Sequence, residues 1–281
     1  MGDENDLIIG CSTNYDWSKL KYWINSINMS GFKGEKVLIL MNCDRDTVEK
    51  ISAAGFKIVG FNRDEQGNFK YESRLPVHVE RFIHIYNYID PSRHRNVITT
   101  DVKDVIFQKD PGRWVRENIY VGKNLFFASE SIRYKNEPWG DQNLRETFGQ
   151  FIYDRFKDNE IYNVGVLAGR AQAIKDLCMN IFAATIGKPI AICDQSTFNF
   201  MISQHPYTDT SIYFKSEDGW AAQLGTTGDP TKIQKFKPYL LEPCPKFENE
   251  ILKTSKGTEF CIVHQYDRVP AIAKVIERKY A

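Results

Sequence analysis

The sequence predicts an α/β fold in which helices flank a mixed central sheet, and three observations lead to this prediction. The first hundred residues alternate short β-branched runs with segments whose apolar residues recur at helical spacing. This alternation is typical of a parallel sheet with covering helices. The second half adds further strand-like and helix-like segments in a less regular order. A chain of 281 residues with 42% apolar content can also bury one large core.

The first half reads as strand and helix in strict alternation. Apolar runs predict strands at residues 6–12, 36–43, 56–61 and 96–108. Helical spacing predicts helices at residues 16–29, 44–56 and 76–90. The second helix is opened by aspartates and closed by Gly55. The third places Val79, Phe82, Ile83 and Tyr86 on one face. The result is a Rossmann-like nucleotide-binding half, in which ligands bind beyond the carboxyl ends of the strands.

The second half continues the same domain. Strands are expected at residues 124–130, 161–169 and 259–264, and helices at 170–186, 194–203 and 270–280. No linker, repeat or charge block marks a boundary. We therefore expect a single domain over residues 1–281, with a nucleotide-donor half at 1–105 and an acceptor half at 106–281.

Composition limits the classes of binding partner and the cellular compartment that we expect. The 37 basic and 36 acidic residues nearly cancel, so no overall field favours nucleic acid or an anionic membrane surface. The longest run without charge, residues 195–208, is too short and too polar for a membrane span. The N-terminal segment is acidic and does not resemble a signal peptide. The six scattered cysteines indicate free thiols in a reducing compartment, so we expect a cytoplasmic protein.

Two aspartates interrupt the fourth apolar run, "NVITTDVKDVIFQ". Strict strand alternation would send Asp101 and Asp104 to opposite faces, so they can meet at one ion only if the chain turns at Val102 and Lys103. Carboxylate oxygens at this spacing suit Mg²⁺ or Mn²⁺. The alternative, an aspartate solvated at a strand end, stays open on these two residues alone.

Four segments together resemble the GT-A glycosyltransferases. "ITTDVKDVIF" is similar to their D-x-D or D-x-x-D metal motif, in the form found in collagen galactosyl- and glucosyltransferases. "YNVGVLAGR" and "CDQSTFNFMI" resemble the Asn-x-Gly strand and the Asp-Gln helix start of the glycogenin-like and bacterial lipopolysaccharide transferases. "EFCIVHQYDR" supplies the late histidine that completes the metal site in that superfamily. The order of the four segments also agrees.

The resemblance implies a metal-dependent enzyme that moves a monosaccharide from a UDP-sugar to a hydroxyl of a glycan acceptor. The sugar would be a hexose or a pentose. A weaker likeness to the capsid glycosyltransferases of algal viruses includes xylosyl transfer, and would place the protein in the cytoplasm of a host cell. The implied metal ligands are Asp101, Asp104 and His264, and the imidazole shifts the preference from Mg²⁺ toward Mn²⁺. A core histidine is the alternative for His264.

The remaining site residues divide between the two substrates. For Asp194 the catalytic role is that of a general base or a hydrogen-bonding anchor, and its alternative is a helix N-cap. Arg81 is expected to bind the donor, and its alternative is an exposed arginine on a helix. The segment after the first strand, residues 11–15, is also expected to bind the donor, and its alternative is a helix cap. The expected donor-binding residues are Cys11, Ser12, Thr13, Tyr15, Arg81, Thr100, Asp101, Asn163, Gly165 and Arg268. The expected acceptor-binding residues are Glu130, Trp139, Asp194 and Gln195.

Two other classes of function compete with transfer. One is a catalytically inactive scaffold that binds a nucleotide sugar, and the other is a metal-dependent nucleotidyl or phosphoryl transferase. The sequence lacks the G-x-x-x-x-G-K-[ST] phosphate loop and the G-x-G-x-x-G dinucleotide signature, which removes the commonest forms of the latter. The motifs leave open whether the sugar's anomeric configuration is inverted or retained.

Overall fold

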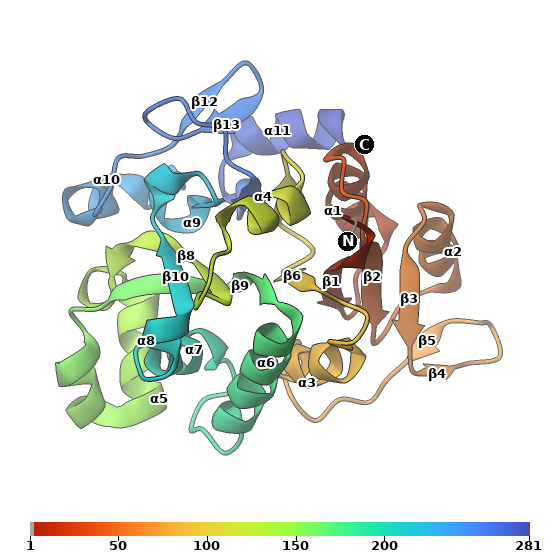
Figure 1. Cartoon of the computed structure of the whole chain (residues 1–281), viewed down its shortest axis with the longest axis horizontal. Coiled ribbons are helices and arrows are strands. Elements are labelled where there is room, and N and C mark those ends of the chain that lie inside the picture. The colour runs from red at the N-terminus through yellow and green to blue at the C-terminus, as the bar shows by residue number, and fades with distance from the viewer. Residues whose placement is uncertain (1–2) are drawn as a thin grey trace.

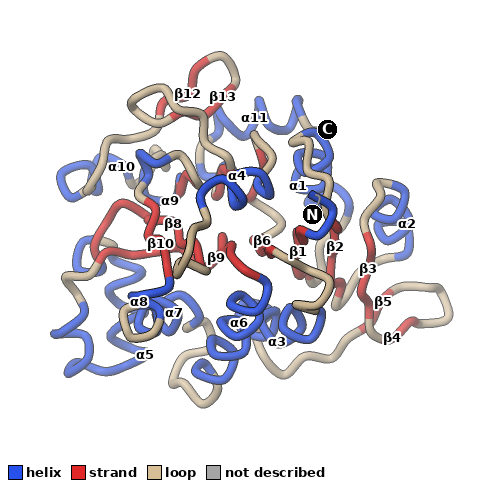
Figure 2. Tube along the Cα trace, in the orientation of Figure 1, coloured by secondary structure: helices blue, strands red, loops and turns tan. Residues whose placement is uncertain are grey.

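The computed structural model describes residues 3–281 and shows a central sheet with helices on both faces (Figure 1). Within this part of the chain, seven strands form the sheet in the order β10-β8-β9-β6-β1-β2-β3. In Figure 2 these strands run through the middle of the molecule and the helices surround them. The strands are β1 (Asp6–Ser12), β2 (Glu35–Leu40), β3 (Lys57–Gly60), β6 (Asn96–Thr100), β8 (Leu125–Arg133), β9 (Glu160–Arg170) and β10 (Ser211–Phe214).

The predicted α/β class and the alternating first half are confirmed. Strands β3, β2, β1 and β6 pair in parallel, and they are connected through α1 (Trp17–Met29), α2 (Arg45–Ala53) and α3 (Val77–Tyr88). Helix α2 starts as predicted, because the Asp44 side chain accepts a hydrogen bond from the Thr47 amide. It ends before Gly55, whose φ of +82° lies in the left-handed region.

The two faces of the sheet carry separate apolar cores. Along β1, Ile8 packs with helices α1, α2 and α4 (Pro111–Asn118), whereas Leu7 and Ile9 pack with α3, α6 (Ala171–Thr185) and α7 (Asp194–Ile202). Helices α3 and α6 lie side by side over the latter face (Figure 1). On α3 one prediction needs correction: Ile83 is only half-buried, and Ile85 occupies the core position instead.

The apolar run after Asp104 does not continue β6. It forms a separate strand, β7 (Val105–Phe107), which pairs antiparallel with β14 (Ile262–His264), and β14 pairs in parallel with β11 (Ala221–Gln223). The expected single strand over residues 96–108 is therefore two strands in two sheets. This second sheet brings His264 opposite Val105, directly beside the aspartate turn.

The other elements lie around this frame. Helix α5 (Pro138–Phe156) was not predicted, and it is two helical segments joined across Gly149, whose φ is +76°. Across residues 3–281, no helix combines the length and the apolar character that crossing a membrane requires. The remaining strands and helices are β4 (Asn62–Arg63), β5 (Phe69–Lys70), α8 (Tyr207–Thr210), α9 (Leu224–Thr227), α10 (Ile233–Phe236), β12 (Lys246–Glu248), β13 (Ile251–Lys253) and α11 (Pro270–Lys279).

Candidate active site

The chain turns between the two aspartates, as their spacing predicted. Strand β6 ends at Thr100, and the backbone bends over residues 102–104 before β7 begins. Val102 is buried and points into the core beneath Gly10, while Asp101 and Asp104 face a cavity. Two backbone hydrogen bonds fix the turn, from the Asp101 amide to the Gly165 carbonyl (2.8 Å) and from the Gln265 amide to the Asp104 carbonyl (2.7 Å).

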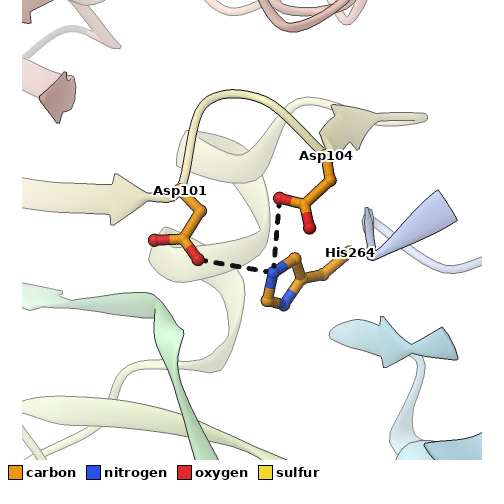
Figure 3. Close-up of side chains that lie close together, drawn as sticks. All are labelled: Asp101, Asp104 and His264. Carbon is orange, nitrogen blue, oxygen red and sulfur yellow. Dashed lines mark ion pairs between the residues drawn. The ribbon is translucent and has the colours of Figure 1, made fainter. Parts of the chain in front are cut away.

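His264 meets both aspartates across this turn. Its Nε2 lies 3.5 Å from Asp101 Oδ2 and 3.6 Å from Asp104 Oδ1 (Figure 3). One ligand atom from each of the three side chains falls within 4.8 Å of the other two. These separations allow a single divalent ion to contact all three, and two carboxylates with one imidazole form a donor set suited to Mn²⁺ or Mg²⁺.

Gln223 orients the imidazole of His264. Its Oε1 lies 2.7 Å from His264 Nδ1, and the parallel pairing of β11 with β14 places the two residues side by side. The hydrogen bond assigns the proton to Nδ1, so Nε2 faces the two carboxylates with its lone pair. Burial lowers the pKa of His264, although the nearby Asp104 carboxylate opposes this. A neutral imidazole facing two carboxylates in this way is repelled unless a cation lies between them.

Gly165 forms the floor beneath these ligands. A Cβ at this position would lie 2.6 Å from Asp101 Oδ2, 2.8 Å from Asn163 Oδ1 and 2.9 Å from His264 Cε1. Any larger residue would therefore force the ligands apart. The neighbours that crowd Gly165 are thus candidate metal ligands, and the expected contact of Gly165 with the donor stays a prediction.

Arg81 connects the aspartate turn with the start of helix α7. The guanidinium donates to Asp101 Oδ1 and, over 3.2 Å, to Asp194 Oδ2. Arg81 is 8% exposed, so it is not an exposed helix arginine. Asp194 is also buried, and its side chain does not cap its own helix but pairs with Arg81. The Arg81 guanidinium thus joins a carboxylate of the candidate metal centre with the expected catalytic carboxylate.

The site residues line a polar cavity of about 390 Å³. The predicted residues that it brings together are Arg81, Asp101, Asp104, Glu130, Trp139, Asn163, Gly165, Asp194, Gln195, His264 and Arg268. Glu130 lies deep in this cavity, whereas the Trp139 side chain is exposed at its edge. The cavity opens at the carboxyl end of β6, where the fold type binds its ligands.

Within residues 3–281, five of the predicted donor residues do not line the cavity: Cys11, Ser12, Thr13, Tyr15 and Thr100. Cys11 and Ser12 end β1, and Thr13 and Tyr15 follow it. Strand β1 is the parallel neighbour of β6, so this segment lies at the same edge of the sheet. Tyr15 packs partly against the core. The Thr100 hydroxyl accepts a hydrogen bond from the Trp23 indole (2.9 Å). The Thr100 side chain therefore faces helix α1 and not the cavity.

Several lining residues were missed from the sequence. His78 could have been found, because it lies three residues before Arg81 on the same turn of α3. Val164 and Gln265 lie within the quoted segments "YNVGVLAGR" and "EFCIVHQYDR" but beside the residues that carry the resemblance, and the others come from loops and short helices that carry no motif. The missed residues are His78, Glu137, Val164, Ile192, Gly225, Thr226, Lys232 and Gln265.

Comparison with known proteins supports the fold assignment. No protein-family model matches the sequence, and no curated protein matches it either. The fold is similar to the apo structure of the bifunctional glycosyltransferase WbbM, with a TM-score of 0.57 and 10% sequence identity. The match covers 99% of this chain and 52% of WbbM, so the chain spans about half the length of that protein. At this identity the likeness concerns the fold, which is the GT-A type of α/β fold that the motifs predicted.

Proposed function

We propose that this chain transfers a monosaccharide from a UDP-sugar to a hydroxyl of a glycan acceptor, in the reducing cytoplasm that its scattered cysteines indicated. The convergence of Asp101, Asp104 and His264 in a polar cavity of a GT-A fold is the observation that carries this proposal. The three side chains would hold Mn²⁺, or Mg²⁺. A bound divalent ion neutralises the negative charge that develops on the departing diphosphate.

Basic residues around the metal centre support a diphosphate ligand. Arg81 faces Asp101 from one side, and Arg268 and Lys232 line the cavity from elements that follow β11 and β14. Charge-assisted hydrogen bonds from such groups favour phosphate oxygens. We assign the uracil and ribose to the loop of Cys11, Ser12, Thr13 and Tyr15, because this loop lies at the edge of the sheet next to Asp101.

The far side of the cavity is assigned to the two sugars. Asp194 and Gln195 start helix α7 and are both buried against the cavity, where they can contact hydroxyl groups of the transferred sugar. Since Asp194 already anchors Arg81, we give it the anchoring role of the two that the motif allowed. Trp139 is 49% exposed at the edge, and its ring offers a flat apolar face to an acceptor sugar.

The test is whether UDP and Mn²⁺ bind together and through the three ligands. UDP with Mn²⁺ should raise the thermal unfolding midpoint, by the equivalent of about 2.7 kcal/mol at a hundredfold excess over the dissociation constant. Asp104→Asn should abolish this rise, because one of the carboxylate ligands is lost. The exposed carboxylate Asp158 provides the control Asp158→Asn, which should respond like the wild type.

A second measurement distinguishes an enzyme from a scaffold. The wild-type protein should release UDP from at least one of UDP-glucose, UDP-galactose and UDP-xylose in the presence of Mn²⁺, with water as a slow acceptor. A protein that binds UDP and Mn²⁺ but releases no UDP from these donors would be the inactive scaffold. A midpoint that UDP and Mn²⁺ leave unchanged would refute the proposed donor site.

A further inference from the structure

Glu130 is presented to the cavity by an irregular strand. The pairing of β8 with β9 shifts register between Phe127 and Ala128 and again between Ser129 and Arg133. Within the second shift Ser131 has a φ of +56°, which lies in the left-handed region. Such bulges re-aim a side chain, and they are common beside active sites. The Glu130 carbonyl is fixed in addition by the Thr226 hydroxyl (2.7 Å), so the position of this residue is well defined.

The two oxygens of the Glu130 carboxylate have different surroundings. Oε1 accepts hydrogen bonds from Asn163 Nδ2 (2.7 Å) and from Gln195 Nε2 (3.0 Å). Oε2 accepts none from the residues that the structure describes, although Glu130 is only 5% exposed and lines the cavity. A buried carboxylate is costly unless its oxygens have partners. Oε2 is not among the fully buried atoms that lack a partner, so it is open to the cavity, where a hydroxyl of the substrate can reach it.

Apart from the candidate metal ligands, two other carboxylates line the cavity beside Glu130. Glu137 caps helix α5 by accepting a hydrogen bond from the Gly140 amide, and Asp194 is arranged differently again. Its Oδ2 accepts a hydrogen bond from the Arg81 guanidinium, which also holds Asp101. A change at Asp194 would therefore disturb Arg81 and the metal centre together. Glu130 has no cation among its hydrogen-bond partners, which are both neutral amides.

We propose that Glu130, through Oε2, is the general base that deprotonates the acceptor hydroxyl; this inference rests on the proposed function. The acceptor oxygen loses its proton to Oε2 and forms a bond to the anomeric carbon of the donor sugar. The bond from that carbon to the diphosphate oxygen breaks, and its electron pair leaves with the UDP. Glu130 is then a neutral carboxylic acid that returns its proton to water. This single displacement inverts the anomeric configuration.

The surroundings of Glu130 agree with this role. Burial raises the pKa of Glu130, and the Glu137 carboxylate raises it further, while the hydrogen bonds from Asn163 and Gln195 lower it. A raised pKa brings a carboxylate nearer to the range in which it accepts a proton efficiently. Asn163 and Gln195 act as positioning residues, because they hold Oε1 and leave Oε2 toward the cavity.

The test compares binding with turnover in Glu130→Gln. Glutamine keeps an acceptor oxygen for Asn163 and Gln195 but cannot take a proton. We expect UDP with Mn²⁺ to raise its unfolding midpoint as in the wild type, while UDP release from the UDP-sugar falls by about 10²–10⁴-fold. Formate should restore part of the release in Glu130→Ala, since a small carboxylate can enter the vacated space. The sugar that the wild type releases should have the inverted configuration in NMR spectra recorded before mutarotation.

The control is Glu217→Gln, because the Glu217 carboxylate accepts hydrogen bonds from Ser255 outside the cavity and should not affect turnover. Near wild-type UDP release by Glu130→Gln, or a retained configuration, would overturn this inference and leave the proposed function standing. Absence of UDP release by the wild-type protein from every donor would overturn both.

Discussion

At the scale of single residues, Gly165 shows how closely the candidate metal ligands approach the backbone. Because a Cβ would lie within 3 Å of both Asp101 and His264, Gly165→Ala should push these side chains apart. We expect the variant to lose the stabilisation by UDP and Mn²⁺, and to lose about 1–3 kcal/mol of unfolding free energy through overpacking. Thermal unfolding with and without UDP and Mn²⁺ measures both effects.

Gly257 provides a matched control for this prediction. It has a φ of +90°, and a Cβ there would meet nothing within 4 Å, so Gly257→Ala strains a turn without touching the cavity. It should cost about 1 kcal/mol of stability and keep the full response to UDP and Mn²⁺. If Gly165→Ala responded to the ligands as Gly257→Ala does, the proposed crowding of the metal centre would be wrong.

The residues of the site differ in how far the sequence could reveal them. Asp101, Asp104 and His264 were predictable as a group, because their motifs are ordered along the chain and chemically distinctive. Gln223 was not, since it is a single polar residue in a three-residue strand and its contact with His264 depends on the register of β11 against β14. Side chains that orient a ligand residue leave little pattern in the sequence.

At the scale of elements, the spacing of apolar residues along the sequence predicted those helices and strands whose buried faces are apolar. It failed for α5, whose buried positions include Gly140, Asn143 and Thr147, and whose helical path is interrupted at Gly149. It also failed to separate β6 from β7, because apolar residues flank the aspartates on both sides and continue the pattern. A change of sheet within a continuous apolar run has no local signal.

The start of strand β2 gives a prediction for how stability depends on pH. On β2, the Glu35 carboxylate accepts hydrogen bonds from Tyr88 at the end of α3, from His94 (2.9 Å) and from Lys57 on β3 (3.3 Å). Burial by itself would raise the pKa of Glu35, but these hydrogen bonds lower it to about 2. The unfolded chain therefore binds more protons than the folded chain below about pH 4.5, and stability falls as the pH falls from there toward 2.

The expected contribution of Glu35 is about 1–2 kcal/mol after allowance for screening by solvent. Glu35→Gln should therefore lose less unfolding free energy between pH 6 and pH 3 than the wild type loses, as measured by urea unfolding. Glu65→Gln, at an exposed residue between β4 and β5, should lose as much as the wild type. Equal losses in Glu35→Gln and the wild type would show that the pKa of Glu35 is not lowered.

At the scale of the whole molecule, the two halves of the chain share one sheet, and both halves contribute to the apolar core on each of its faces. Strand β9 lies between β6 and β8 and pairs antiparallel with both, so the second half inserts directly against the first. The apolar core around Trp23 of α1 also contains Trp220 from the second half. The candidate metal ligands come from both halves as well. The sequence could not reveal the pairing of β6 with β9, because the paired residues are more than sixty positions apart along the chain.

This continuity predicts that residues 1–105 and 106–281 unfold together. Tryptophan fluorescence, whose five sources include Trp23 and Trp220, and far-UV circular dichroism should give coincident urea transitions. UDP with Mn²⁺ should move this whole transition to higher urea, because the ligands that bind them are drawn from the entire chain. Two separate transitions, with UDP and Mn²⁺ shifting only one of them, would instead mean that the shared sheet does not couple the halves. In that case the metal centre would form within a subset of the fold, and the convergence of Asp104 and His264 would need another explanation.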